Sequence, residues 1–526
     1  MLESSSSTDP EAHIAQLESL LSQRTAQIEV RDLRIRLLEE ALRVLKADKY
    51  GASREKLGQA PGQHGLFNEA EAIMELTEAV GVEPGLTATP LRETRTTDTT
   101  AGRKALASHL PRIEIRHELP ANERRCACGT ALVEIGAETS EQLDYVPAKV
   151  QVIRHVRPKY ACACCHSGVK IAPVPAQILP RSNAAPGLLA HLITAKYVDS
   201  LPLHRQETIF ARHGVALPRA TQAAWIIGVA QQLQPLINLM DERVRASGYI
   251  RIDETPMQVL KGEKPAGSEH WMWVRVAGAP GQRLILFDYD PSRGAPVAER
   301  LLEGAHGYVQ SDGYTAYDSV AARLKLTHAG CFAHARRRFF EAIKALPTSE
   351  QKRASAAHDI VRRIDALYAI EREIKALSPE ARAVERQQKA LPLLNVLHAL
   401  ASSLQQQTLP SGKLGEALAY LLKQWPKLIR YVDDGCLAID TNLAENAIRP
   451  FALGRRNWLF ADTIKGAKAS ASLYGIVETA KANGLEPYAY LRKLLEQLPH
   501  AKTVADFEAL LPFSLSASAT SDAQPA

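Results

Sequence analysis

The stretch Tyr249–Leu260, YIRIDETPMQVL, restricts the fold of this 526-residue chain more than any other. Its side chains alternate as in a half-buried strand, with Ile250 and Ile252 on one face and Asp253 on the other. A carboxylate at the end of such a strand is costly unless a cation or hydrogen bonds hold it. Asp253 is therefore a candidate metal ligand, whereas alternation turns Glu254 to the opposite face and argues against it as a ligand.

Further strands are predicted after this one. Apolar runs over His270–Ala277 and Arg283–Asp290, bounded by turn residues, predict an antiparallel meander. A helix over residues 295–302 and a fourth strand, GYVQSDGY, follow, and that strand ends at Asp312. This order matches a ribonuclease H-like fold, in which the first and fourth strands are neighbours. Asp253 and Asp312 could then hold one metal ion between them.

A third carboxylate has to come from a distant segment. Glu445 lies near the start of a predicted helix that begins at Thr441 or Asn442. Pro450 is expected to kink or end that helix. An exposed glutamate paired with Arg449 one turn later is the alternative. Three carboxylates can hold two Mg²⁺ or Mn²⁺ ions about 4 Å apart, which is the arrangement that supports phosphodiester cleavage by water.

The interval between Asp312 and Glu445 is too long for a loop and predicts an all-helical insertion at about residues 345–432. Basic residues follow Glu445, and others follow Cys331. They can neutralise phosphates, and an aromatic side chain can stack on an unpaired base, although a solvated basic face with a core tryptophan is the alternative. The candidate DNA-binding residues in these two regions are Arg449, Arg455, Arg456, Trp458, Lys465, Arg336 and Arg337.

Two helices broken at Gly214 lie within residues 186–235 and have the spacing of a helix-turn-helix. The second would present Arg219, Thr221 and Gln222 to DNA bases. An ordinary helical hairpin in a core is the alternative.

Five of the seven cysteines fall between residues 126 and 165, which favours a metal site over a disulfide framework. Structural Zn²⁺ held by Cys126, Cys128, Cys162 and Cys165 in a zinc ribbon is the leading interpretation. Cys164 and His166 are alternative ligands. Two competing interpretations of the same residues are buried free cysteines and a c-type haem signature, CxxCH.

An a/d heptad pattern at the N-terminus predicts a coiled coil and self-association, with a lone amphipathic helix as the alternative. Arg24 and Arg31 interrupt it. No apolar run reaches the roughly 18 residues that span a bilayer, so the expected location is the cytoplasm, at the nucleoid, with no membrane partner. The heptad positions are Ile14, Leu17, Leu21, Ile28, Ile35, Leu38, Leu42 and Leu45.

The motifs RIDETP, QSDGYTAYDS, GCFAHARRRF, NLAENAIRPFALGRRNWLF and ETAKANGLEPYAYLRKLL resemble the large transposase of the bacterial insertion-sequence family sixty-six, one of the DDE transposases. The segments KYGASREKL and KYVDSLPLHRQE and the cysteine pairs also fit. The resemblance implies a DDE triad of Asp253, Asp312 and Glu445, with Mg²⁺-dependent cleavage of element ends and joining of the 3′-hydroxyl to target DNA. It also implies that the cysteine cluster is a zinc-binding domain.

The expected fold is a multidomain α+β chain whose ribonuclease H-like α/β core carries the helical insertion. The expected parts are a coiled coil (1–50), a linker (51–115) with a short helix at Glu69–Val80, a zinc-binding domain (116–175), a helix-turn-helix-like domain (176–245), the catalytic domain (246–470), a helical domain (471–512) and a disordered tail (513–526). DNA, a second copy of the chain and accessory proteins of the element are the expected partners. A DNA-binding protein without activity and a metal-dependent nuclease without strand transfer are the competing functions.

Overall fold

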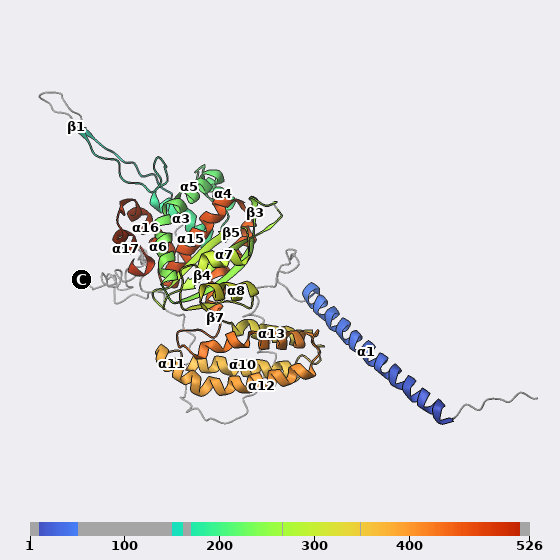
Figure 1. Cartoon of the computed structure of the whole chain (residues 1–526). Helices are drawn as coiled ribbons and strands as arrows, with labels where there is room; N and C mark the ends of the chain where they lie inside the picture. Colours follow the sequence, from blue (N-terminus) through green and yellow to red (C-terminus); the bar gives the residue numbers. More distant parts are fainter. Residues whose placement is uncertain (1–9, 51–149, 161–169, 266, 348, 516–526) are drawn as a thin grey trace, which may run out of the picture. The chain divides into compact units, whose positions relative to one another are not determined.

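The computed structural model describes residues 10–50, 150–160, 170–265, 267–347 and 349–515 (Figure 1). The chain divides into two compact units, Met1–Gly81 with Pro158–Ala526 and Val82–Arg157, and the elements named below belong to the first. Strands β1 (Lys159–Tyr160) and β2 (Lys170–Ile171) form an antiparallel pair. The predicted zinc ligands, the linker with its short helix and residues 516–526 of the predicted C-terminal tail lie outside the described residues. Phe513 and Leu515, at the start of that tail, pack against the large hydrophobic cluster of the first unit.

A mixed sheet with the strand order β5-β4-β3-β6-β7 organises the first unit. The predicted meander is confirmed, because β3 (Tyr249–Lys261), β4 (Glu269–Ala277) and β5 (Leu284–Asp290) pair antiparallel. Strand β6 (Tyr308–Gln310) runs parallel to β3 and is its neighbour, as we predicted, and β7 (Thr327–Ala329) extends the sheet beyond β6. Helix α7 (Ala295–Leu302) and helix α8 (Thr315–Leu324) precede and follow β6.

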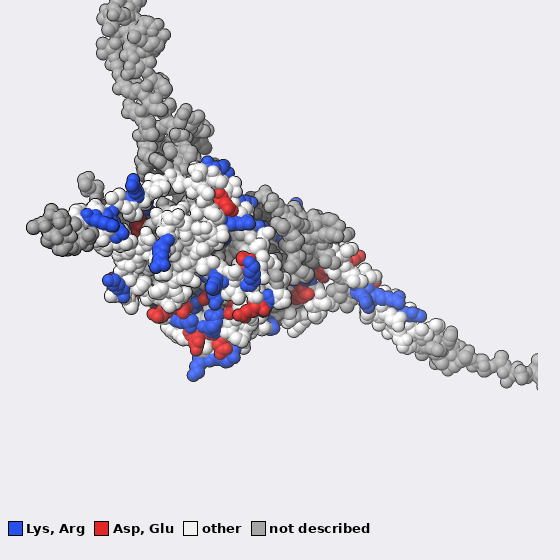
Figure 2. All heavy atoms as spheres, turned by 90° about the horizontal axis from the view of Figure 1, so that it is seen from above, with Lys and Arg blue, Asp and Glu red and all other residues white. Residues whose placement is uncertain are grey.

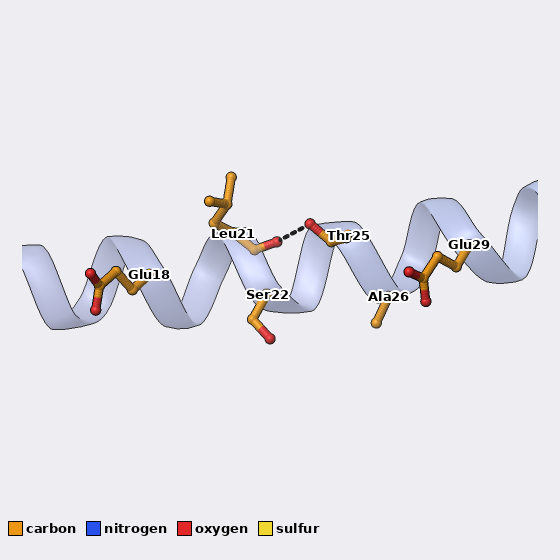
Figure 3. Close-up of a pocket in the computed structure, with 6 residues that line it drawn as sticks. All are labelled: Glu18, Leu21, Ser22, Thr25, Ala26 and Glu29. Carbon is orange, nitrogen blue, oxygen red and sulfur yellow. Dashed lines mark hydrogen bonds between the residues drawn. The ribbon is translucent and has the colours of Figure 1, made fainter.

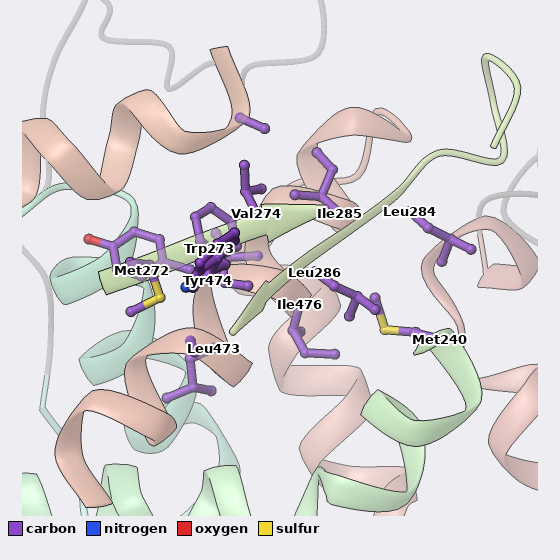
Figure 4. Close-up of a cluster of buried hydrophobic side chains, with 14 of the residues drawn as sticks. Met240, Met272, Trp273, Val274, Leu284, Ile285, Leu286, Leu473, Tyr474 and Ile476 are labelled. Carbon is purple, nitrogen blue, oxygen red and sulfur yellow. The ribbon is translucent and has the colours of Figure 1, made fainter. Parts of the chain in front are cut away.

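Both faces of β3 contribute to one large hydrophobic cluster, because Met257 and Val259 on the face of Tyr249 are buried in it as well. Ile250 and Ile252 are buried in a large cluster that also takes side chains from β4, β5, α6 (Gln234–Arg245) and α15 (Ile464–Ala482). Figure 4 shows part of this cluster, with α15 side chains packed against those of β4 and β5. Tyr249 packs instead against the cluster formed by the helical insertion. The start of β3 therefore contacts both clusters.

Three helices precede the sheet: α3 (Pro186–Tyr197), α4 (Leu203–Arg212) and α5 (Arg219–Gln232). Most of the buried apolar side chains of α3 and α5 lie in the large cluster with those of the sheet. Gly214 turns the chain between α4 and α5 with a φ of 73°, a left-handed conformation that glycine adopts without strain. Leu192, Phe210 and Leu217 make a small core of their own between these helices.

The long interval between β7 and Asn442 is helical, as the apolar spacing predicted. The helices pack side by side as a bundle (Figure 1) around one hydrophobic cluster. They are α9 (Phe332–Ala345), α10 (Ala356–Glu373), α11 (Pro379–Glu385), the π-helical turn η1 (Arg386–Ala390), α12 (Leu391–Gln407), α13 (Lys413–Leu428) and the 3₁₀ turn η2 (Ile429–Val432).

After the bundle the chain returns to the sheet through α14 (Asn442–Trp458), β8 (Ala461–Thr463) and α15. Strand β8 pairs in parallel with the far end of β3. Thr479 in α15 accepts a hydrogen bond from the Ile285 amide and donates one to the Ile285 carbonyl, which fixes α15 on strand β5. The chain closes with α16 (Pro487–Gln497), the 3₁₀ turn η3 (Leu498–His500) and α17 (Val504–Ala509).

The N-terminal heptad region is helical over its whole predicted length within α1 (Pro10–Tyr50). Its described a/d side chains are exposed, with Leu21 at 70%. A shallow depression on α1 is lined by Glu18, Thr25 and their neighbours (Figure 3). It is formed by one helix alone, so it offers no enclosed ligand site. Among the described residues, no helix has the length and apolar character required to cross a membrane.

Candidate active site

The strand register brings Asp253 and Asp312 to the same level of the sheet. Arg251 on β3 lies opposite Gln310 on β6, so the two aspartates, each two residues further on, continue adjacent strand paths. Asp312 lies in the loop after β6, where its Oδ1 accepts a hydrogen bond from the Tyr314 amide at 2.9 Å. That bond closes a side-chain turn, a typical use of aspartate before a helix, and holds the carboxylate at the edge of the sheet.

Glu445 reaches the same place from the first turn of α14. Its carboxylate accepts a hydrogen bond from Thr441 Oγ1 at 3.3 Å, and its Oε2 lies 3.7 Å from Arg337 Nη2. Pro450 lies inside α14, so it does not end the helix. Arg449 lies one turn after Glu445 and is half-buried.

A buried glutamine joins the strands to the segment that precedes α14. Gln310 Nε2 donates hydrogen bonds to the carbonyls of Gly330 and Ala438, both at 2.8 Å, and its Oε1 accepts one from the Tyr249 hydroxyl. That hydroxyl in turn accepts a hydrogen bond from the Ala438 amide at 3.1 Å. These contacts bring the approach to α14 against β3 and β6, which is how an acid so distant in sequence reaches the aspartates.

Arg386 holds the same returning segment from the bundle side. It is 1% exposed, and Nε and Nη2 donate to the Glu371 carboxylate at 2.8 and 2.7 Å. Its remaining hydrogen bonds go to the carbonyls of Tyr431, Asp434 and Leu437 at 2.7 to 2.9 Å. A planar guanidinium satisfies all of these acceptors at once, which an ammonium could not.

The three acids act on one another electrostatically. Burial raises the pKa of Asp253 well above its usual value, and the carboxylates of Glu254, Glu445 and Asp312 raise it further. Burial also raises the pKa of Glu445, whereas Arg337 lowers it. Negative charge gathered in a buried site is costly, and a divalent cation relieves that cost.

The donor set fits hard cations. All three side chains offer carboxylate oxygens, which Mg²⁺ prefers. Among the described residues, the three acids do not form a group whose ligand atoms all lie within 4.8 Å of one another.

Glu254, the residue after Asp253 in β3, is held by partners of its own, and the carboxylate of Asp312 acts on it electrostatically. Its side chain is 1% exposed, and it pairs with Arg293 Nε at 2.8 Å and accepts a hydrogen bond from the Tyr317 hydroxyl. The Arg293 guanidinium lies over the rings of Trp271 and Tyr314, at 4.8 and 4.3 Å from their centroids. Sequence reasoning missed this cluster, because nothing in the pattern marks Arg293 as the partner.

Cys331 and His334 are the other residues that sequence reasoning missed. The His334 imidazole Nδ1 lies 3.4 Å from Glu445 Oε1, and the Cys331 thiol is buried beside them. Burial and the carboxylates of Glu445 and Asp440 raise the pKa of that thiol. The spacing Cys-x-x-His at the start of a helix was a signal that could have found both residues.

The predicted DNA-binding residues divide by environment. Arg336 is mostly buried and pairs with Asp365 at 2.6 Å, and Arg337 turns toward Glu445, so neither lies on an open basic face. Trp458 is half-buried, with its ring at 5.4 Å from that of Phe451, in the manner of a core residue. Arg456 and Lys465 are exposed.

Arg455 is half-buried, and burial together with the charge of Arg456 lowers its pKa. In Figure 2, lysine and arginine on the face shown are interspersed with aspartate and glutamate and form no single basic patch there.

Among the three helices before the sheet, Arg219 is exposed at the first residue of α5, where it can reach a ligand. Gln222 cannot reach a ligand, contrary to our prediction that it contacts DNA bases. It is fully buried and donates a hydrogen bond to the Leu217 carbonyl at 2.9 Å, which ties α5 to the turn before it. A buried amide needs such a partner, and a backbone carbonyl one turn earlier supplies it.

Comparison with known proteins adds a family to this geometry. Residues 181–469 match the model described as Transposase IS66 family, residues 123–166 the zinc-finger binding domain of transposase IS66, and residues 476–513 the IS66 C-terminal element. Residues 37–115 match Transposase C of IS166 homeodomain.

Two proteins of Sinorhizobium fredii, both named as uncharacterized proteins, are similar over most of their length. Protein y4jD is 35% identical over 78% of this chain and 81% of its own. Protein y4qI is 32% identical over 91% and 89%.

Proposed function

The chain belongs to the Transposase IS66 family, and we propose on this basis that it cleaves DNA at the ends of an insertion sequence and joins the freed 3′-hydroxyl to target DNA. The observation that carries the proposal is the convergence of Asp253, Asp312 and Glu445 from a strand, a loop and a helix. Catalysis would take place in a ribonuclease H-like core.

Asp253, Asp312 and Glu445 would hold two divalent ions. Bound Mg²⁺ or Mn²⁺ would lower the pKa of the attacking water and stabilise charge on the leaving oxygen. The protein supplies the positions: β3 and the loop after β6 fix the two aspartates, and the contacts of Gln310 and Arg386 fix the helix that carries Glu445. Arg337, beside Glu445, would either orient this carboxylate or contact a phosphate.

The remaining parts of the chain would bind DNA and pair with a second copy of the chain. Arg219, Arg449, Arg455, Arg456 and Lys465 are the residues we assign to DNA. A structural zinc ion in the cysteine-rich domain and pairing of α1 with a second copy complete the proposal, and the exposed apolar side chains of α1 support the pairing. We place the activity in the cytoplasm, at the nucleoid.

Purified protein, Mg²⁺ and a labelled DNA fragment that carries one end of the element test the reaction. The wild type should release a product with a 3′-hydroxyl, and Asp253→Asn, Asp312→Asn and Glu445→Gln should each reduce cleavage by at least about 100-fold while DNA binding persists. A DNA-binding protein without activity would give no wild-type product. A nuclease would cleave but give no joined product with a target plasmid.

A further inference from the structure

A group of three potential metal ligands lies where the helical bundle leaves and rejoins the sheet. Cys331 directly precedes α9, His334 lies in the first turn of α9, and Glu445 lies in the first turn of α14. The ligand atoms of these three side chains all lie within 4.8 Å of one another. Among the described residues, this is the one group of three or more His, Cys, Asp or Glu residues that meets this criterion. Residues that are remote in sequence thus present sulfur, nitrogen and oxygen to one point.

The spacing of these atoms suits a tetrahedral ion. His334 Nδ1 and Glu445 Oε1 are 3.4 Å apart. Ligands about 2.0 to 2.1 Å from a tetrahedral zinc ion lie about 3.3 to 3.5 Å from each other. The oxygen nearest His334 is Oε1, which also lies 3.3 Å from Thr441 Oγ1, whereas Arg337 lies toward Oε2.

The Cys331 sulfur has hydrogen-bond donors beside it, whereas burial and the carboxylates of Glu445 and Asp440 raise the pKa of the thiol, an effect that a bound cation would offset. The Thr441 amide donates to Sγ at 3.3 Å. The Thr441 hydroxyl lies 3.2 Å from Sγ and 3.3 Å from Glu445 Oε1, so its one proton serves one of these two acceptors at a time. Donors of this kind around sulfur are the outer contacts that orient a metal-bound thiolate and stabilise its charge. The residue is 2% exposed, so it does not serve as a surface nucleophile.

We propose that Cys331, His334 and Glu445 bind a zinc ion, at a site distinct from the cysteine-rich domain that shares the Glu445 carboxylate with the acidic cluster. A mixed sulfur, nitrogen and oxygen donor set selects a borderline divalent metal over Mg²⁺. Zinc binding would release the thiol proton to solvent and leave a fourth position for water. The ion would fasten the start of α9 to the start of α14 and thereby fix Glu445.

The site shares Glu445 with the proposed function, but its test does not depend on DNA cleavage. Zinc per chain is measured by elemental analysis of the full-length protein after dialysis against a weak chelator. Cys331→Ser and His334→Gln should each contain one zinc ion fewer per chain than the wild type. The matched control Cys436→Ser, which changes an exposed free cysteine, should lose none.

A milder variant keeps the proposal testable if the ligand variants fail to fold. Thr441→Val removes only the hydroxyl that contacts sulfur and should release zinc to a competing chelator about 10 to 100 times more readily than the wild type. Equal zinc content in the wild type, Cys331→Ser and His334→Gln, or equal retention in Thr441→Val, would overturn the proposal. Loss of zinc with intact DNA cleavage would uphold the site but contradict its role in fixing Glu445. Full cleavage by the Asp253 variant would overturn only the proposed function.

Discussion

Replacing Arg386 by methionine should destabilise the protein and displace Glu445. The arginine is buried, and the change would leave the Glu371 carboxylate and three backbone carbonyls without their donor. Breaking a buried pair by removing one partner costs about 3–5 kcal/mol, because the other charge stays buried. We expect a loss of that size in the free energy of unfolding, measured by urea denaturation followed by circular dichroism.

Two further variants separate the pair from general damage. Arg386→Met combined with Glu371→Leu should recover more than half of the loss, since no buried charge then remains unpaired. Arg372→Met, a change at an exposed position of the same bundle, should stay within about 0.5 kcal/mol of the wild type. A loss below about 1 kcal/mol for Arg386→Met, or a double variant as unstable as the single one, would show that this pair does not hold the returning segment.

Three other predictions concern a turn, a lysine and an aspartate. Gly307→Ala should lower the free energy of unfolding several times more than Gly304→Ala. Both glycines have a φ of 77°, but only at Gly307 would the new Cβ lie 2.2 Å from a carbonyl oxygen. Similar losses in the two variants would contradict this. Burial lowers the pKa of Lys196 from 10.5 to about 8, so the folded state disfavours the charged amine and stability should rise from pH 8 to pH 10. Lys196→Met should abolish that rise and be about 2 kcal/mol more stable than the wild type at pH 7. If the stability of the two proteins changed in parallel with pH, burial of a charged Lys196 would not be the cause. Asp253→Asn should raise the melting temperature of the metal-free protein by relieving carboxylate repulsion while it abolishes cleavage, and a lower melting temperature would count against the crowded acidic site.

The sequence was sufficient for the features that depend on short-range periodicity. Alternation in Tyr249–Leu260 predicted that Ile250 and Ile252 share a face, and both are buried in the large cluster. The order of strands predicted that β6 lies beside β3. From these, the proximity of Asp253 and Asp312 followed, because parallel neighbours present their ends at one edge of a sheet.

Long-range partnerships were beyond the sequence. Glu254 needed a cation, but Arg293 lies on a loop after β5 with no periodic signal. Gln222 looked exposed at the start of α5, yet tertiary packing buried it against Leu217. Arg386 belongs to an irregular helical turn, and only the folded bundle brings three distant carbonyls to its guanidinium.

The proposed reaction depends above all on Asp312 as a metal ligand, and a change of ligand chemistry at this residue tests that role. Asp312→Cys replaces an oxygen donor by sulfur, which binds Mg²⁺ poorly and Mn²⁺ better. Cleavage of the labelled element end by this variant should fall at least about 100-fold with Mg²⁺ and recover substantially with Mn²⁺, whereas the wild type should use both ions. Full activity of the variant with Mg²⁺ would contradict a metal-binding role for Asp312.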